Sequence, residues 1–107
     1  MKRLKFDSSL VGKILSGTKT TTWRLWDDKH LTEGDEVEFI DGGTGKAFAK
    51  AKLTDVNEKY FKKLLKEDWE GHERFLSEKK MYETYKKYYG KEVTPETTVK
   101  VIRFELI

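Results

Sequence analysis

The chain has 107 residues, of which 36% are hydrophobic and 38% charged, and its net charge is +3. This length supports one domain, residues 1–107, and the sequence holds neither Cys nor an apolar run near the ~18 residues of a membrane span. The composition thereby excludes disulfides, thiolate nucleophiles, cysteine-based zinc sites and a membrane-spanning helix. The opening MKRLKFDSS lacks the apolar region of a signal peptide, so we expect a cytoplasmic protein without a membrane partner.

The N-terminal part predicts a strand followed by a helix. Lys2–Phe6 is the first strand, and Asp7 and Ser8 supply N-caps for a helix that reaches Ser16. Gly17 follows as a left-handed C-terminal stop. The apolar positions of this helix fall on one face at helical spacing: Leu10, Val11, Ile14 and Leu15.

Three strands are predicted in the middle of the chain. Consecutive Thr residues favour an extended segment from Thr20 to Leu25. Two further strands, Glu36–Ile40 and Lys46–Val56, are joined by the hairpin loop Asp41–Gly45. This glycine-rich loop is not a Walker A phosphate loop, because Ile40 stands where the first Gly is needed.

Two helices and a closing strand are predicted in the last part. Phe61, Leu64 and Leu65 indicate a short helix, and Ser77 caps a longer one that runs through Tyr89. We interpret the apolar and aromatic stripe of the longer helix as core packing; it comprises Met81, Tyr82, Tyr85, Tyr88 and Tyr89. The final strand, Thr98–Ile107, alternates apolar and polar residues.

This order predicts an α+β fold. We expect a small, mostly antiparallel β-barrel or curled sheet of about five strands, because closure removes the exposed edges of short strands. One helix follows the first strand, and a helical insertion precedes the last strand. No internal repeat or linker divides the chain.

Residues 16–26, SGTKTTTWRLW, are the most informative stretch of the chain. They combine two cations, hydroxyl groups and two indoles, and residues 1–24 as a whole carry six Lys or Arg against one acid. Cations, hydroxyls and stacking rings suit a ligand that bears phosphate or a base. The alternative interpretation is a half-buried strand with a solvated polar face.

Metal and triad chemistry are not indicated. His30 and His72 are the two histidines, and they lack the spacing of a metal-binding helix. Neither lies in a recognisable Ser-His-Asp context, so we expect no metal and no cofactor.

The segment Gly17–Arg24, followed ten residues later by Gly34-Asp35, resembles the ASCH domain family. The resemblance covers nearly the whole chain and implies a small PUA-like β-barrel that binds or acts on RNA. Within that family the chain is similar to the small N4-acetylcytidine amidohydrolases, whose motif Gly-x-Lys-Thr-x-Thr-x-Arg is matched by Lys19, Thr20, Thr22 and Arg24.

The resemblance implies a role for each matched residue. Lys19 would be the proton acceptor, Thr22 the nucleophile, and Glu70 of the helical insertion the proton donor. The acid stays open among four neighbours: Glu67, Asp68, Glu70 and Glu73. Substrate-binding residues would be Thr20, Trp23, Arg24 and Trp26. The expected partner is a modified nucleoside or RNA, and the alternatives are a non-catalytic RNA-binding module and a small ribonuclease of the same fold.

The chemistry sets two conditions on Lys19. A lysine acts as a base only when neutral, so its pKa must fall by roughly 3 units from about 10.4. In a regular strand Thr22 and Arg24 share a face, whereas Lys19 points to the other. Lys19 must therefore lie in the turn after Gly17, outside the regular pleat.

Overall fold

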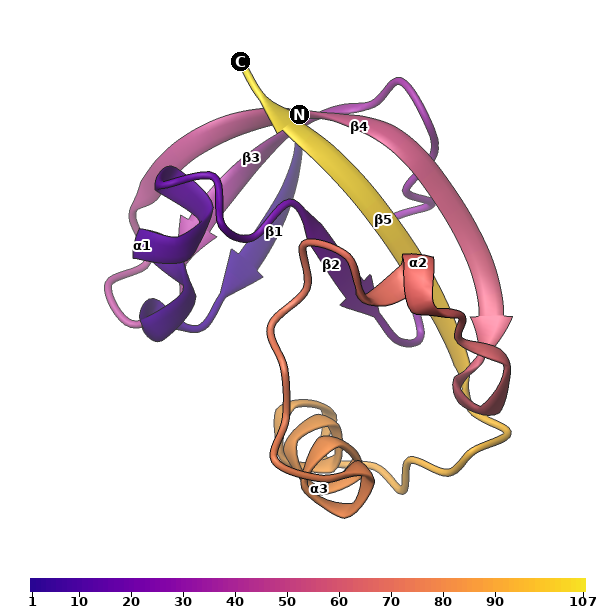
Figure 1. Cartoon of the computed structure of the whole chain (residues 1–107). Helices are drawn as coiled ribbons and strands as arrows, with labels where there is room; N and C mark the ends of the chain where they lie inside the picture. Colours follow the sequence, from indigo (N-terminus) through magenta and orange to yellow (C-terminus); the bar gives the residue numbers. More distant parts are fainter.

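Five strands and three α-helices make up the computed structural model, which describes residues 1–107 (Figure 1). In chain order the elements are β1 (Lys2–Phe6), α1 (Ser8–Leu15), β2 (Thr21–Arg24), β3 (Glu36–Asp41), β4 (Ala47–Tyr60), a 3₁₀ turn (Phe61–Lys63), α2 (Lys66–Trp69), α3 (Glu78–Tyr89) and β5 (Thr98–Leu106). The predicted α+β class is confirmed.

The strands form one sheet in the order β1-β3-β4-β5-β2. Only the pair β1–β3 is parallel, and the other three pairs are antiparallel. The register of β4 with β5 shifts between Leu53 and Asp55. Such a bulge bends a strand and increases its twist. In Figure 1, β4 and β5 accordingly curve together, and the sheet is a curled half-barrel whose edges are β1 and β2.

A first core fills the half-barrel beneath α1. Phe39 lies at its centre, where its ring meets those of Phe6 (centroids 4.6 Å apart) and Phe104 (4.9 Å). Aliphatic residues complete the cluster: Leu4, Ile14, Leu31, Val37, Ala51, Leu53 and Ile102. The helix α1 contributes Ile14 from its apolar face and so closes this end of the half-barrel.

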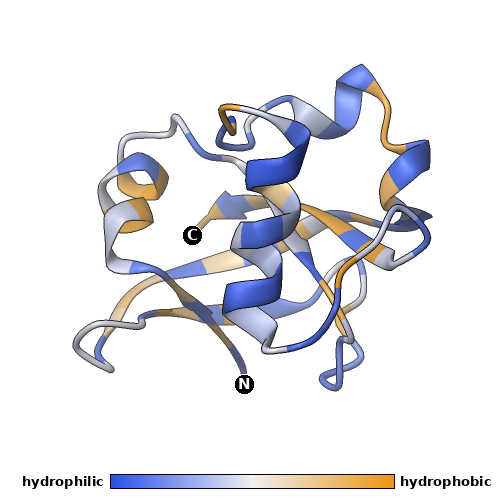
Figure 2. Cartoon of the chain, turned by 90° about the horizontal axis from the view of Figure 1, so that it is seen from below, coloured by the Kyte–Doolittle hydropathy of each residue, from blue (hydrophilic) through white to orange (hydrophobic).

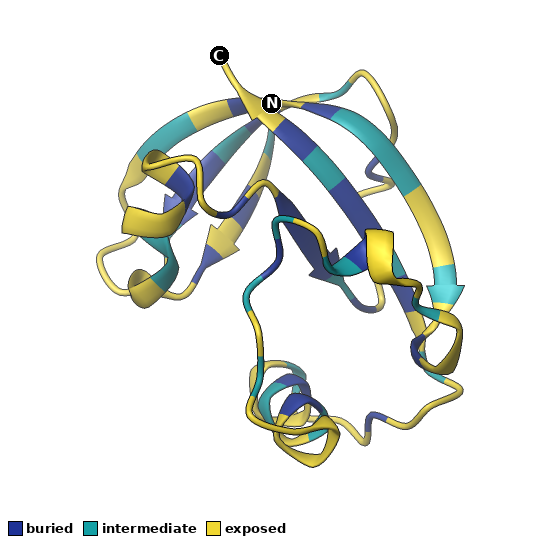
Figure 3. Cartoon of the chain, viewed as in Figure 1, coloured by how far each residue is buried: buried dark blue, intermediate teal, exposed yellow.

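A second core lies between β2, β5 and the helical insertion. Its members are Trp23, Leu25, Phe61, Met81, Tyr85, Val93, Val99 and Val101. Figure 2 shows that α3 is mostly hydrophilic. Most of its residues are Lys, Glu and Tyr, and its inward side presents tyrosines beside Met81. In Figure 3 only its inner side is buried. Core packing therefore describes Met81 and Tyr85, whereas Tyr88 is exposed.

The boundaries of several elements differ from those expected. The strand β4 continues past Val56 to Tyr60, because β5 pairs with it as far as Thr98. The one short helix expected near residues 61–65 is divided into the 3₁₀ turn and α2. No helix in the structure is long and apolar enough to cross a membrane.

Candidate active site

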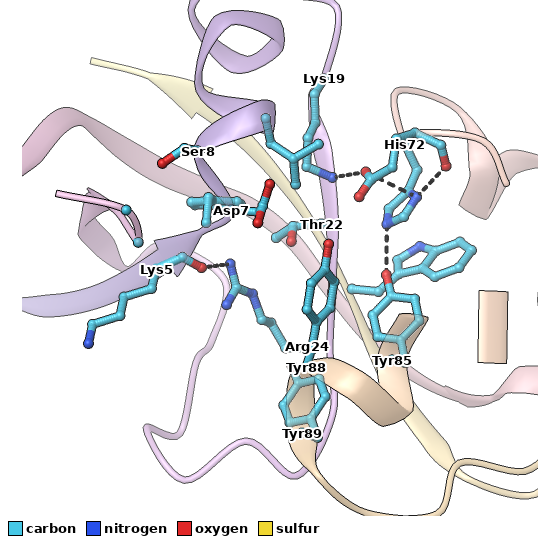
Figure 4. A pocket seen from close by; sticks show the side chains of 16 residues that line it. Lys5, Asp7, Ser8, Lys19, Thr22, Arg24, His72, Tyr85, Tyr88 and Tyr89 are labelled. Atoms are coloured by element: carbon cyan, nitrogen blue, oxygen red, sulfur yellow. Dashed lines mark hydrogen bonds and ion pairs between the residues drawn. The ribbon is translucent and has the colours of Figure 1, made fainter. Parts of the chain in front are cut away.

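A cavity of about 420 Å³ opens where the two sheet edges approach each other. Its walls come from the end of β1, the start of α1, the cavity-facing side of β2, the Gly42-Gly43 loop and α3 (Figure 4). The guanidinium of Arg24 in β2 donates a hydrogen bond to the carbonyl oxygen of Lys5 in β1 (2.8 Å). That contact gives an unpaired carbonyl of an edge strand a partner and closes one side of the cavity.

The pleat of β2 divides its side chains between the cavity and the insertion. Thr22 and Arg24 share a face and line the cavity, as alternate residues of a strand do. On the opposite face, the Thr21 hydroxyl donates to the carbonyl oxygen of Glu70 (2.7 Å), and the Trp23 indole donates to that of Asp68 (3.2 Å). One strand thus presents the hydroxyl of Thr22 and simultaneously anchors the insertion.

Lys19 lies between Gly17 and the start of β2, outside the regular pleat. Gly17 has φ +83°, and the Lys19 backbone N–H donates to the carbonyl oxygen of Lys13 (3.0 Å). The Lys19 side chain is only 2% exposed, and its Nζ donates to the Thr21 carbonyl oxygen (2.7 Å) and to the Glu73 carboxylate. The condition set by the sequence, that Lys19 leave the pleat, is met.

Gly71 fixes how the insertion meets this segment. Its carbonyl oxygen accepts hydrogen bonds from the backbone N–H groups of Thr20 (2.8 Å) and Thr21 (3.1 Å). Its φ is +74°, and a Cβ at this position would lie 2.0 Å from the Thr20 hydroxyl oxygen. Glycine is therefore required here, and the chain that leaves it carries Glu73 to the ammonium group of Lys19.

The structure brings Glu73, not Glu70, to the cavity. Glu70 and Glu67 are exposed and do not line it. Asp68 is buried elsewhere, where its carboxylate binds Lys59 (2.8 Å) and accepts the backbone N–H of Leu65. Because the turn at Gly71 separates Glu70 from the cavity, adjacency to the glycine in sequence is a poor guide to position.

The expected binding residues are also redistributed. Trp23 is almost fully buried in the second core, and Thr20 is exposed beside Gly71. Trp26 is 46% exposed outside the cavity, where its ring meets Tyr89 and the ammonium of Lys91. The aromatic walls of the cavity are supplied by Phe6, Tyr85, Tyr88 and Tyr89, and Trp23 also contributes to the lining from the second core.

Arg24 lines the cavity and carries one buried donor that has no partner. Its guanidinium carbon lies 4.6 Å from the centre of the Phe6 ring, a cation–π contact. Its Nε is buried and has no hydrogen-bond partner in the chain. A buried donor without a partner costs about 1–3 kcal/mol.

The electrostatics of the cavity follow from burial and one ion pair. Burial lowers the pKa of Lys19, although the nearby Glu73 carboxylate opposes the change. Burial alone would raise the pKa of Glu73, but His72 and Lys19 outweigh it, and the pKa is lowered. Burial and the charge of Lys19 lower the pKa of His72 to about 4, so His72 is neutral at pH 7.

The sequence interpretation missed His72 and the tyrosines of α3. The sequence indicates His72 neither as a metal ligand nor as a triad member, and the structure contains no cluster of His, Cys, Asp or Glu able to hold a metal. The available indication was the tyrosine stripe, because a helix that only packs into a core usually presents aliphatic residues rather than hydroxyl-bearing rings.

The family model of the ASCH domain matches residues 2–107. The chain belongs to the ASCH domain family. No curated protein matches it. The resemblance inferred from residues 17–35 is therefore confirmed, and the cavity described above is the pocket of an ASCH domain.

Solved structures share the fold of this ASCH domain. The hypothetical protein PH0355 is 26% identical to this chain, and their alignment covers 100% of each chain with a TM-score of 0.74. Protein EF3133 from Enterococcus faecalis V583 is 18% identical over 94% of this chain and 71% of its own, with a TM-score of 0.77. An ASCH domain from Lactobacillus crispatus JV V101 is 16% identical over 92% and 70%, with a TM-score of 0.66.

Proposed function

We propose that this ASCH protein hydrolyses the amide of N4-acylated cytidine or a similar modified nucleoside. The observation that carries the proposal is the buried Lys19–Glu73 pair beside Thr22, in one cavity. The cavity volume of about 420 Å³ falls within the range of about 300–1,000 Å³ typical of small-molecule sites. Figure 4 shows the Thr22 hydroxyl facing the cavity, with no hydrogen bond or ion pair drawn to it.

The Lys19–Glu73 pair supplies both a base and an acid once one proton moves. As an ion pair, it holds an ammonium and a carboxylate. Transfer of a proton from Nζ to the carboxylate produces a neutral amine and a carboxylic acid without changing the total charge. Immediately after the transfer the Nζ lone pair faces Glu73, and rotation about the Cε–Nζ bond brings it to the third position of Nζ, which has no hydrogen bond to the chain because the other two are held by the Thr21 carbonyl and Glu73.

Amide cleavage then follows in two balanced steps. The Thr22 oxygen attacks the acyl carbon while Lys19 accepts its proton, and Glu73 protonates the exocyclic nitrogen as the C–N bond breaks. This step releases cytidine and leaves an acyl ester on Thr22. The pair then transfers its proton from Lys19 to Glu73 once more, and the neutral Lys19 deprotonates a water that attacks the ester. Lys19 returns that proton to the Thr22 oxygen as the C–O bond breaks, which releases the carboxylic acid and restores the hydroxyl.

Arg24 and Tyr88 are suited to holding the nucleoside. The guanidinium of Arg24 lines the cavity and carries a charge that attracts a carbonyl oxygen of the pyrimidine or the oxyanion of the acyl group. Tyr88 is half exposed at the rim, and a base stacked on such a ring gains about 1–3 kcal/mol. These groups take over the role that the sequence assigned to Trp23 and Trp26.

Turnover of N4-acetylcytidine by the purified protein, followed by chromatography, tests the proposal. Lys19→Ala, Thr22→Ala and Glu73→Gln are each expected to lower kcat/KM by at least about 10²-fold, the scale of lost acid–base catalysis. The exposed substitutions Lys63→Ala and Glu83→Gln serve as matched controls and should leave the rate unchanged. No turnover together with tight, salt-sensitive RNA binding would replace the hydrolase with a non-catalytic RNA-binding module.

A further inference from the structure

We infer that Tyr85 and His72 form a neutral hydrogen-bond relay that orients Glu73 and controls how the Lys19–Glu73 pair shares its proton. The inference rests on the proposed function for its catalytic meaning. The relay itself is a property of the free protein. Both residues act through Glu73, so they are positioning residues.

The hydrogen bonds of the relay run from α3 to the main-chain carbonyl of Glu73, and the Glu73 carboxylate lies close beside His72 Nδ1. The Tyr85 hydroxyl lies 3.2 Å from His72 Nε2, and His72 Nδ1 lies 2.9 Å from the Glu73 carbonyl oxygen and 3.3 Å from a carboxylate oxygen of Glu73. The same carboxylate oxygen accepts from Lys19 Nζ. In Figure 4, dashed lines join His72 to Tyr85 on one side and, through the carboxylate between them, to Lys19 on the other.

Hydrogen-bond logic fixes the tautomer of His72. A neutral imidazole has one N–H, and a carbonyl oxygen is only an acceptor. Nδ1 must therefore carry the hydrogen and donate it toward Glu73. Nε2 is then an acceptor, so the Tyr85 hydroxyl donates to it. The Glu73 carbonyl thus selects the tautomer, and the hydrogen bond from Tyr85 to Nε2 stabilises it.

Packing holds the imidazole in place. The Trp23 ring stacks on it with centroids 3.8 Å apart and an interplanar angle of 19°. His72 and Tyr85 are both nearly inaccessible to solvent. Other contacts of the Tyr85 ring, with Phe61 and Phe75, fix the helix side of the relay. The orientation of Glu73 is consequently determined by packed side chains of the protein interior rather than by solvent.

The charges around the relay explain why its neutrality matters. Lys19 and Arg74 disfavour a proton on His72, whereas Glu73 favours one. Arg24 is the other nearby cation, and it acts on Lys19 and Tyr85. An imidazolium at this position would lock Glu73 as a carboxylate and prevent it from donating a proton. A neutral donor supports the carboxylate and still lets it accept a proton.

Nuclear magnetic resonance of protein labelled with ¹⁵N-histidine tests the relay without any substrate. The chain has only two histidines, and His30 is exposed, which simplifies the assignment. His72 should show a protonated Nδ1 and an unprotonated Nε2 throughout about pH 5–8. An imidazolium or the opposite tautomer in this range would overturn the proposal.

Matched variants test its effect on catalysis. Tyr85→Phe and His72→Leu should lower kcat by about 10–100-fold, the scale for a supporting partner of a functional group, and move the acid limb of the kcat/KM profile to higher pH. His72→Asn, whose amide replaces the Nδ1 donor, should recover much of the loss. Tyr82→Phe is the control, because the Tyr82 hydroxyl on the same helix has no hydrogen-bond partner.

The outcomes separate this proposal from the hydrolase proposal. A fall in rate without movement of the acid limb, or no rescue by His72→Asn, would reduce His72 to a packing residue. If no nucleoside is hydrolysed, titration of the Glu73 carboxyl followed by ¹³C nuclear magnetic resonance still tests the relay. Its pKa should rise in Tyr85→Phe relative to the unsubstituted protein, and an unchanged pKa would refute the relay.

Discussion

The two cores of this domain are built from different chemistry. The first core, beneath α1, consists of aliphatic and Phe side chains and contains no ionisable group. The second core, beside the insertion, centres on Trp23 and Tyr85 and adjoins the buried groups Lys19, Asp68 and His72. The cavity lies between the two cores. The apolar first core supports one of its walls, and the polar and aromatic second core supports the other.

The contrast shows how a small domain keeps polar groups buried beside a ligand cavity. Most polar groups in and beside the second core have a partner, the Tyr82 hydroxyl being an exception: Asp68 binds Lys59, His72 binds Tyr85, and the Tyr89 hydroxyl accepts the backbone N–H of Leu25. A buried polar group without a partner costs several times the net gain of a hydrogen bond. The second core therefore depends on contacts between distant parts of the chain. The first core depends mainly on how completely its apolar side chains fill the space between the strands and α1.

The largest effects are expected from truncating the centre of each core. Phe39→Ala and Trp23→Ala should each lower the free energy of unfolding by about 3–5 kcal/mol in urea titrations. At low temperature, the folded fraction of Phe39→Ala should retain most of its turnover, whereas Trp23→Ala should lose it, because Trp23 holds His72. Equal losses of turnover in the two variants would show that the first core and the second core do not differ in their importance for the site.

The next effect is a pH dependence of stability that arises in the second core. His72 has a pKa of about 4 when folded, against about 6.5 when unfolded, so the unfolded state binds more protons between these values. Stability should therefore rise by about 3 kcal/mol from pH 4 to pH 6.5 on account of this group and stay level above that range. Urea titrations of His72→Gln should show a correspondingly flatter profile, and His30→Gln should keep the original slope.

Gly71→Ala should have an intermediate effect concentrated on the site. The substitution places a Cβ against Thr20 and strains a residue at φ +74°, at a cost of about 1–3 kcal/mol. Gly45→Ala is the matched control, because Gly45 has a similar φ of +75° but open space around it. Turnover should fall far more in Gly71→Ala than in Gly45→Ala, and equal falls would show that Gly71 does not position Glu73.

The smallest effect is expected outside both cores. Trp26 is 46% exposed and lies away from the cavity, so Trp26→Ala should cost less than about 1 kcal/mol. The KM for N4-acetylcytidine should stay within about twofold, whereas Tyr88→Ala should raise it by roughly tenfold or more through lost stacking. A larger rise in KM for Trp26→Ala would restore the binding role that the sequence suggested.

Much of the fold could be predicted because local chemistry decides it. Caps and stops define α1 and α3, since Asp7 and Ser77 accept from the first turn of each helix and Gly17 and Gly90 take up positive φ. Alternation of apolar and polar residues located β3 and β5 within a residue or so. The length of β4 was underestimated, because its last residues are held by pairing with β5 rather than by their own pattern.

The candidate site divides in the same way. The motif from Gly17 to Arg24 is local, and strand alternation predicts that Thr22 and Arg24 share a face, whereas Lys19 joins them only because the turn after Gly17 places it outside the pleat. Which acid joins them depends on the turn at Gly71, and which rings line the cavity depends on how α3 packs. Neither is encoded in the spacing along the chain.

By itself, the sequence determined the elements, the family and the cationic motif, because short-range propensities, capping and strand alternation act within a few residues. Only the tertiary structure decided that Glu73 rather than Glu70 meets Lys19, that Trp23 is buried, and that His72 and Tyr85 stand behind the site. Those outcomes depend on contacts between residues roughly fifty positions apart, where the pleat of β2 and the turn at Gly71 set which side chains face the cavity.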